Sequence, residues 1–120
     1  MKGENAMNDC LFCKIIKGDI PSTKVYEDGN CYAFRDINPQ APVHVVLVPK
    51  THVHGLDEAD GLTDAELAAL VRAASAIAKQ EGLDKSGYRL ISNCGDDACQ
   101  SVGHLHFHIL GGRKMAEQMA

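Results

Sequence analysis

The sequence lacks a long apolar run and an excess of basic charge. None of its apolar runs approaches the length that a membrane-spanning helix needs. Residues 1–8 hold one lysine and no apolar stretch, so we expect neither a signal peptide nor a membrane anchor. The formal net charge of -4 leaves no basic field for DNA or RNA, although local donors can still bind a small anion. We therefore expect neither membrane nor nucleic-acid partners.

The chain also lacks an even set of cysteines. It has five, and without an export signal they fit reduced thiols or metal ligands better than a disulfide framework, which predicts a cytoplasmic protein. With 120 residues, 45% of them apolar and 23% charged, the chain suits one soluble domain. We predict that this domain spans residues 10–114, after a disordered or extended segment at 1–9 and before a short tail at 115–120.

Hydrophobic periodicity predicts two helices and five strands. Asn8 and Asp9 suit the cap of a short helix over about 10–17, and Thr63-Asp64-Ala65-Glu66 has the form of a capping box for a longer helix that ends near Gly82. The apolar face expected on the longer helix is Leu67, Leu70, Val71, Ala74, Ile77 and Ala78. The expected strands are 24–27, 31–36, 44–48, 88–93 and 104–110. This order predicts an α+β domain with a five-stranded antiparallel sheet.

All six histidines fall into two groups. His44, His52 and His54 lie in and after the central strand, and His104, His106 and His108 alternate along the last one. Alternate residues of a strand share a face, so the second group puts three imidazoles on one side. Such a row can supply a nucleophile, a proton donor and a phosphate contact, or it can chelate a metal. The plainer alternative is a polar sheet face.

The run from Gln100 to Arg113, QSVGHLHFHILGGR, resembles the signature of the histidine triad (HIT) family, in which three histidines alternate with apolar residues. Its Gly-Gly-Arg ending is similar to the nucleotide-binding phosphoramidase branch. Further similar segments are 11–16, 33–42, 48–50 and 87–90, so the resemblance covers nearly all of residues 10–114. The family resemblance implies a homodimer in which two sheets join edge to edge.

The resemblance implies a site for a purine nucleoside monophosphate and its phosphoramidates. His106 matches the nucleophile that carries the nucleotide, and His108 matches the contact to a phosphate oxygen. His104 opens the triad, and its neighbourhood supplies the carbonyl that holds the other nitrogen of the nucleophile. His44 matches a histidine packed beside the triad.

Further polar and apolar positions follow from the same resemblance. Ser101 and Asn93 match polar groups at the phosphate and leaving group, and Asp36 matches the carboxylate that binds the two ribose hydroxyls. Without the resemblance, Asp36 reads as a turn carboxylate. The expected walls of the base pocket are Leu11, Phe12, Ile15, Phe34, Ile37, Val46 and Val102.

Cys10 and Cys13 form a Cys-x-x-Cys pair, which can be redox-active, metal-binding or simply buried. The resemblance extends to members that bind zinc through this pair and two histidines, here expected to be His44 and His104. Such zinc would be structural, and we expect the chemistry itself to require no cofactor.

The expected reaction is hydrolysis of a purine nucleoside 5'-phosphoramidate, of the adenosine 5'-monophosphoramidase type. Two alternatives remain open. One is cleavage of dinucleoside polyphosphates by another branch of the family. The other is a zinc-binding or nucleotide-binding module that acts on a protein partner without catalysis.

Overall fold

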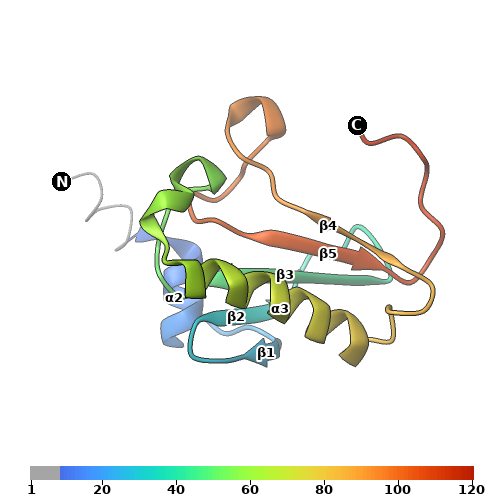
Figure 1. The fold of residues 1–120 in the computed structure, drawn as a ribbon, viewed down its shortest axis with the longest axis horizontal. Coiled ribbons are helices and arrows are strands. Elements are labelled where there is room, and N and C mark those ends of the chain that lie inside the picture. Colours follow the sequence, from blue (N-terminus) through green and yellow to red (C-terminus); the bar gives the residue numbers. More distant parts are fainter. Residues whose placement is uncertain (1–8) are drawn as a thin grey trace.

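The computed structural model describes residues 9–120, so most of the expected segment at 1–9 lies outside the described residues. Its centre is one antiparallel sheet in the order β1-β2-β3-β5-β4 (Figure 1). The strands are β1 (Lys24–Glu27), β2 (Cys31–Arg35), β3 (Val43–Pro49), β4 (Tyr88–Ile91) and β5 (Phe107–Gly111). The α-helices are α2 (Leu11–Lys17) and α3 (Asp64–Gln80), and two 3-10 helices are η1 (Leu56–Gly61) and η2 (Asp96–Ala98). The predicted α+β fold is confirmed.

Side chains of a strand point alternately to the two faces of the sheet, and both faces of β2 and β3 are covered. Ala33, Val45 and Leu47 pack with α3 in the larger core, whereas Phe34 and Val46 pack with α2 in a smaller one. The near-continuous apolar run of β3 follows from this double burial. On β5, Ile109 joins the larger core, so His108 next to it faces the side of α2.

Helix α3 begins with the predicted capping box. The Thr63 side chain accepts from the Glu66 N–H, and the Glu66 carboxylate accepts from the Thr63 N–H. The helix lies across β1, β2 and β3 (Figure 1). The buried face includes Ala73, but Val71 is 64% exposed, so its placement on the buried face was wrong. Val71 lies one residue past Leu70, which places it on the flank of that face.

Helix α2 is capped by Cys10, not by the predicted Asn8 or Asp9. The Cys10 sulfur accepts from the N–H of Cys13 at 3.4 Å, and Gly18 ends the helix with a φ of +87°. Phe12 and Ile15 are buried against the sheet, which fixes the helix there.

The last strand is shorter than predicted at its start. Residues 104–106 lie outside the ladder because Leu105 donates its N–H to Val53 and His104 reaches the carbonyl of Pro49. β4 therefore ends at Ile91, which pairs with His108. The segment from 92 to 106 connects the two strands.

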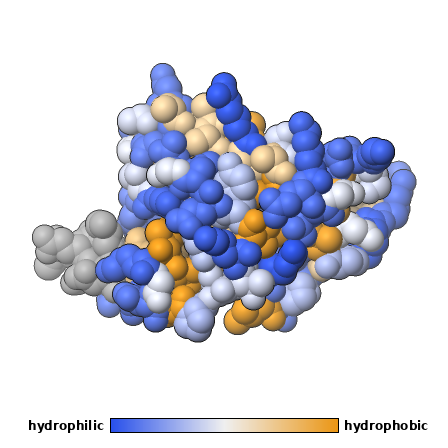
Figure 2. Space-filling view, turned by 90° about the horizontal axis from the view of Figure 1, so that it is seen from below, coloured by the Kyte–Doolittle hydropathy of each residue, from blue (hydrophilic) through white to orange (hydrophobic). Residues whose placement is uncertain are grey.

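The surface seen from below is largely hydrophilic, with apolar side chains gathered at separate places (Figure 2). Exposed apolar residues of the molecule include Leu11, Ile37, Leu56, Val71, Tyr88 and Leu90. Across residues 9–120, no helix is both long and apolar enough to cross a membrane. The tail at 115–120 has no helix or strand, and Arg89 donates to the carbonyl of Ala116.

Candidate active site and metal-ligand cluster

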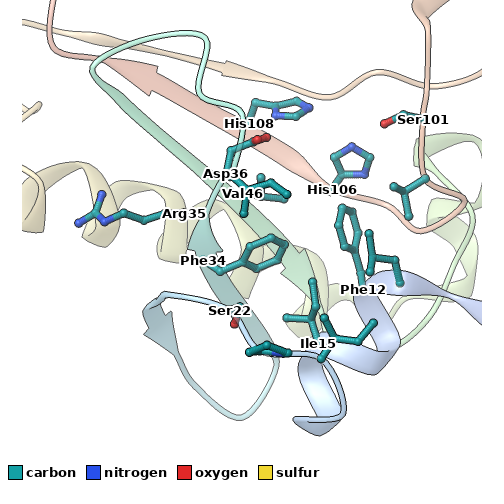
Figure 3. A pocket seen from close by; sticks show the side chains of 15 residues that line it. Phe12, Ile15, Ser22, Phe34, Arg35, Asp36, Val46, Ser101, His106 and His108 are labelled. Atoms are coloured by element: carbon teal, nitrogen blue, oxygen red, sulfur yellow. The ribbon is translucent and has the colours of Figure 1, made fainter.

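A cavity of about 270 Å³ lies between α2 and the sheet. Helix α2 supplies one wall, β2 and β3 supply the floor, and β5 with the segment before it supplies the histidines (Figure 3). The lining residues are Leu11, Phe12, Ile15, Ile20, Pro21, Ser22, Phe34, Arg35, Asp36, Ile37, Val46, Ser101, Val102, His106 and His108. The size and the apolar walls suit a flat aromatic ligand.

Most polar groups of the cavity lie at one end. His106, His108, Asp36 and Ser101 lie there, whereas Phe34 and Ile15 lie toward the other end, together with Ser22, whose hydroxyl is hydrogen-bonded to that of Tyr32 (Figure 3). Phe12 and Phe34 meet edge to face with ring centroids 5.5 Å apart. A ligand with an apolar ring and an anionic group therefore fits the cavity in one orientation.

His106 is held in one tautomer by the backbone. Its Nδ1 lies 2.7 Å from the carbonyl oxygen of His104, and a carbonyl only accepts, so Nδ1 carries the hydrogen. In the neutral ring, Nε2 therefore keeps its lone pair. The ring is 3% exposed and also packs against Phe12, with centroids 5.0 Å apart. Ser92 donates its hydroxyl to the carbonyl of His106 at 2.8 Å.

A chain of hydrogen bonds likewise sets the tautomer of His108. The N–H of Gln40 donates to Nδ1 of His44 at 3.0 Å, so Nε2 of His44 carries the hydrogen. That Nε2 lies 2.8 Å from Nδ1 of His108 and 3.4 Å from Oδ2 of Asp36. His108 then accepts at Nδ1 and keeps a hydrogen on Nε2, so it is a donor for a ligand oxygen.

Burial favours neutral imidazoles at this end of the cavity. It lowers the pKa of His108 from 6.5 to about 4, with a further contribution from His106 and His44. Burial also lowers the pKa of His44, while the Asp36 carboxylate acts in the opposite direction. Both rings therefore act as neutral hydrogen-bonding groups near pH 7.

Outside the cavity, the side chains of two cysteines and two histidines bring four potential metal-binding atoms together. Sγ of Cys10 lies 3.3 Å from Nδ1 of His104, and Sγ of Cys13 lies 3.3 Å from Nδ1 of His52. The two Nδ1 atoms are 3.0 Å apart, and Sγ of Cys13 is 3.5 Å from that of His104. The four atoms lie within 4.8 Å of one another. We call these residues the Cys10-Cys13-His52-His104 cluster.

The donor set and its spacing fit zinc. Two thiolates and two imidazoles are a usual tetrahedral set, and bonds of about 2.0–2.3 Å hold such ligands roughly 3.3–3.8 Å apart. Nε2 of His104 donates to the carbonyl of Pro49 at 2.9 Å, which turns the lone pair of Nδ1 toward the other donors. Asp36, His44 and His108 also bring donor atoms together, but their mutual hydrogen bonds account for that arrangement.

His44 is not part of the Cys10-Cys13-His52-His104 cluster, so the predicted ligand set is corrected to include His52. His44 pairs with Leu110 near the start of β3, whereas the cysteines contact His104, which bonds to Pro49 at the opposite end of β3. His52 follows that end of the strand by three residues. The sequence signal for it was its position after Pro49, where the chain turns toward α2.

Burial opposes charge on the side chains of the Cys10-Cys13-His52-His104 cluster. It raises the pKa of Cys13 to about 11, with the neighbouring Cys10 adding to the shift. It lowers the pKa of His104 to about 4 and lowers that of His52 as well. A bound divalent cation reverses this balance for thiols, because it stabilises the thiolate directly.

The other predicted site residues are placed as follows. Leu11, Phe12, Ile15, Phe34, Val46 and Val102 line the cavity, and so do Ser101 and the 99% exposed Ile37 at its rim. Asn93 is half-buried two residues after β4 and is not among the lining residues. The sequence reasoning missed His52, Ser92 and the lining residues Ile20, Pro21, Ser22 and Arg35.

The position of Asp36 is compatible with both roles predicted for it, as a turn carboxylate and as a ligand-binding carboxylate. Its Oδ1 accepts from the N–H of Asn38 at 2.8 Å, as a turn carboxylate does, while the residue also lines the cavity. The neighbouring Arg35 points away from the cavity and forms a two-bond ion pair with Glu81 (Figure 3). The carboxylate of Asp36 therefore stays free of an arginine.

Fold and site together define a class: small α+β domains with alternating histidines at the polar end of an apolar cavity. The chain belongs to the HIT domain family, whose model matches residues 17–115. A solved HIT family hydrolase from Clostridium thermocellum is similar to it, with a TM-score of 0.86 and 44% identity over 93% of this chain and 97% of that one. A role in hydrolysis or nucleotidyl transfer, in general terms, follows from this membership.

Three curated relatives show how the family varies. A "14 kDa zinc-binding protein" from Zea mays is 51% identical over 88% of this chain and 83% of its own length. An "Adenylylsulfatase HINT1" from Arabidopsis thaliana is 48% identical, over 88% and 72%. A "Purine nucleoside phosphoramidase" from Escherichia coli is 39% identical, over 93% and 94%.

Proposed function

We propose that the protein hydrolyses purine nucleoside 5'-phosphoramidates through a nucleotide bound covalently to His106. The observation that carries the proposal is the 2.7 Å contact from Nδ1 of His106 to the carbonyl of His104, which leaves the lone pair on Nε2. The Escherichia coli relative named as a purine nucleoside phosphoramidase supports the substrate class. The product is the nucleoside monophosphate.

In the first step, Nε2 of His106 attacks the phosphorus in line, and the bond from phosphorus to the amine nitrogen breaks. The amine leaves poorly until it receives a proton, which Ser101 or a neighbouring imidazole relays. His108 donates its Nε2–H to a phosphoryl oxygen and stabilises the charge that develops there. The fixed position of the bound nucleophile gives it the entropic advantage over water.

In the second step, water attacks the same phosphorus, and the bond to His106 breaks. The imidazole regains its lone pair, and the monophosphate leaves with the oxygen of the water. Water hydrolyses the nucleotidyl-imidazole readily because neutral imidazole is a good leaving group. Two easier steps replace one hard step.

The cavity binds the nucleoside part of the substrate. The base lies between the apolar walls that include Phe12, Ile15 and Phe34, and the Asp36 carboxylate accepts from the ribose hydroxyls. Arg35 is occupied by Glu81, so the lining residues His106, His108 and Ser101 supply the phosphate contacts. Asn93 does not line the cavity, and its role at the leaving group is proposed from the family resemblance alone.

We also propose that the Cys10-Cys13-His52-His104 cluster holds a structural zinc ion. The S₂N₂ donor set supports this, and so does the zinc-binding name of the maize relative. Zinc there would connect the start of α2 with the segment after β3, which holds His52, and with the segment before β5, which holds His104. It would supply no nucleophile, because none of the four residues of the cluster lines the cavity.

The assembly that fits the proposal is a cytoplasmic homodimer joined through β4. This strand is an edge of the sheet, and its exposed Tyr88 and Leu90 leave apolar area for a second copy to cover. All five cysteines are free, as reduced thiols are in the cytoplasm.

The proposal is tested on His106→Gly with an adenosine phosphoramidate as substrate. We expect turnover to fall by orders of magnitude, while adenosine monophosphate still binds because the cavity walls remain. Brief mixing of the unaltered protein with labelled substrate should give an acid-labile adduct on His106. Substantial hydrolysis by the variant, or a label on another residue, would contradict the mechanism.

Two comparisons test the alternatives. Faster turnover of diadenosine polyphosphates than of the phosphoramidate would favour the polyphosphate branch of the family. Nucleotide binding without any turnover, unchanged by His106→Gly, would favour a non-catalytic interaction module.

A further inference from the structure

The Cys10-Cys13-His52-His104 cluster and the cavity share helix α2. Cys10 and Cys13 lie at the start of this helix, and the side chains of Leu11, Phe12 and Ile15 from the same helix line the cavity. The orientation of α2 that brings both sulfurs to the two imidazoles is therefore also the orientation that sets one cavity wall.

His104 makes the connection through a single residue. Its Nδ1 is a member of the cluster, its Nε2 donates to the carbonyl of Pro49, and its own carbonyl accepts from Nδ1 of His106. The residue is fully buried, so its three contacts leave it little freedom to move independently. The side-chain contacts to Cys10 and Pro49 help to fix the position of the residue, and its backbone oxygen is the atom that orients His106.

Phe12 provides a second connection. Its ring centroid lies 6.1 Å from that of His104 and 5.0 Å from that of His106, with edge-to-face geometry in both cases. The ring is buried and also lines the cavity, where it meets Phe34. A base in the cavity therefore presses on a side chain that also packs on the cluster.

Without a cation the four donors of the cluster are held together unequally. One hydrogen between Nδ1 of His52 and Nδ1 of His104, which lie 3.0 Å apart, can join the two rings, whereas the two sulfurs contact these nitrogens only at 3.3–3.5 Å. A cation bonded to all four donors also fixes the two sulfurs, and with them the start of α2. An empty cluster relaxes most easily at α2, since the other two ligands flank strands in the middle of the sheet.

We propose that metal binding at the cluster and nucleotide binding in the cavity are coupled, each increasing the affinity for the other. His104 and Phe12 are the positioning residues that carry the coupling. The inference rests on the proposed function above, because it takes a nucleoside monophosphate as the ligand of the cavity. Linkage requires that the two affinities change by the same factor.

The first test measures both sides of this linkage. Calorimetry gives the dissociation constant of adenosine monophosphate for zinc-loaded and metal-free protein, and a competing chelator gives that of zinc with and without saturating nucleotide. We expect both to change by about fivefold or more, in the same direction and by the same factor. Cys13→Ser should abolish the effect, whereas Cys99→Ser, at an exposed cysteine outside the cluster, should preserve it. Equal affinities in all states, or no zinc binding, would overturn the proposal.

A second test uses the loaded protein alone, in case the metal-free chain does not stay folded. Cobalt replaces zinc, and its visible absorption reports the geometry of the four ligands. Saturating adenosine monophosphate should change this spectrum, and Phe12→Leu should reduce the change while cobalt remains bound. An unchanged spectrum at saturation overturns the coupling and leaves the proposed function standing. Failure of the nucleotide to bind at all to loaded protein would instead reject the proposed function.

Discussion

Backbone groups, more than charged side chains, determine the chemistry of the histidines. The carbonyl of His104 assigns the hydrogen of His106, the carbonyl of Pro49 assigns that of His104, and the N–H of Gln40 assigns that of His44. Backbone atoms neither titrate nor exchange rotamers, so each neutral ring keeps the tautomer that its backbone partner assigns. At the residue scale, reactivity is therefore a property of the fold.

Asp36 gives a prediction about the sugar of the ligand. Asp36→Ala should weaken binding of adenosine monophosphate by about 1.5–3 kcal/mol and leave its 2'-deoxy analogue nearly unaffected, because only ribose offers two neighbouring hydroxyls. Calorimetric titration with both nucleotides measures this difference. Asp36→Asn is the matched control for the turn, because its side-chain oxygen can still accept from the N–H of Asn38. Equal losses for the two sugars would leave Asp36 with a turn role alone.

His108 gives a prediction about acid stability. Its pKa of about 4 in the folded protein lies below the ordinary value of 6.5, so the unfolded chain binds more protons between these values. The stability that neutral His108 contributes is fully present above about pH 6.5 and is lost as the pH falls toward about 4. Urea unfolding over this range should show a steeper decline for the unaltered protein than for His108→Asn. Equal slopes for the unaltered protein and the variant would refute the assignment.

At the scale of elements, α3 covers only part of the sheet. It packs on β1, β2 and β3, and it leaves exposed apolar side chains on the edge strand β4. Leu90 pairs with Ile109, so the two side chains share the face of the sheet that α3 packs on. A second copy of the chain would cover the exposed apolar side chains of β4.

Leu90→Lys should therefore weaken the proposed homodimer. A charge on the edge strand opposes both apolar burial and strand pairing, and we expect the dissociation constant of the dimer to rise by at least about tenfold. Sedimentation velocity over a range of concentrations measures it. Leu56→Lys is the control, because Leu56 is 42% exposed but belongs to η1. A monomeric unaltered protein, or equal effects of the two substitutions, would rule out β4 as the interface.

The elements themselves were largely predictable, because local patterns encode them. The capping box fixed the start of α3, and alternation along β2, β3 and β5 predicted the buried and lining faces. The errors occurred where contacts with segments distant in the sequence determine the local structure. His52 joins the cysteines only because β3 ends beside α2, and the first residues of the last predicted strand leave the ladder to bond with Val53 and Pro49. No local signal reports such contacts.

At the scale of the whole molecule, the Cys10-Cys13-His52-His104 cluster joins three segments that are far apart in the sequence. Removal of zinc by a chelator should lower the thermal midpoint, because an ion that binds only the folded state at about 100 times its dissociation constant stabilises it by about 2.7 kcal/mol. For a domain of this size that is a shift of roughly 10 °C. Differential scanning calorimetry with and without chelator checks this. Cys13→Ser should show no such shift, and a full shift in that variant would place the ion elsewhere.

The position of β5 in the sheet has a consequence for how the chain folds during its synthesis. Of the five strands, β5 is synthesised last, yet it lies between β3 and β4 and joins them. Until it emerges, the nascent chain has two incomplete pieces, a three-stranded piece with an unpaired side of β3 and a lone β4. Strands with unpaired edges can pair with other chains and aggregate. A chaperone would therefore be most useful in the interval before β5 has been synthesised. Because the strand that closes the sheet also carries His108 and follows directly on His106, the proposed chemistry becomes available only when folding is complete.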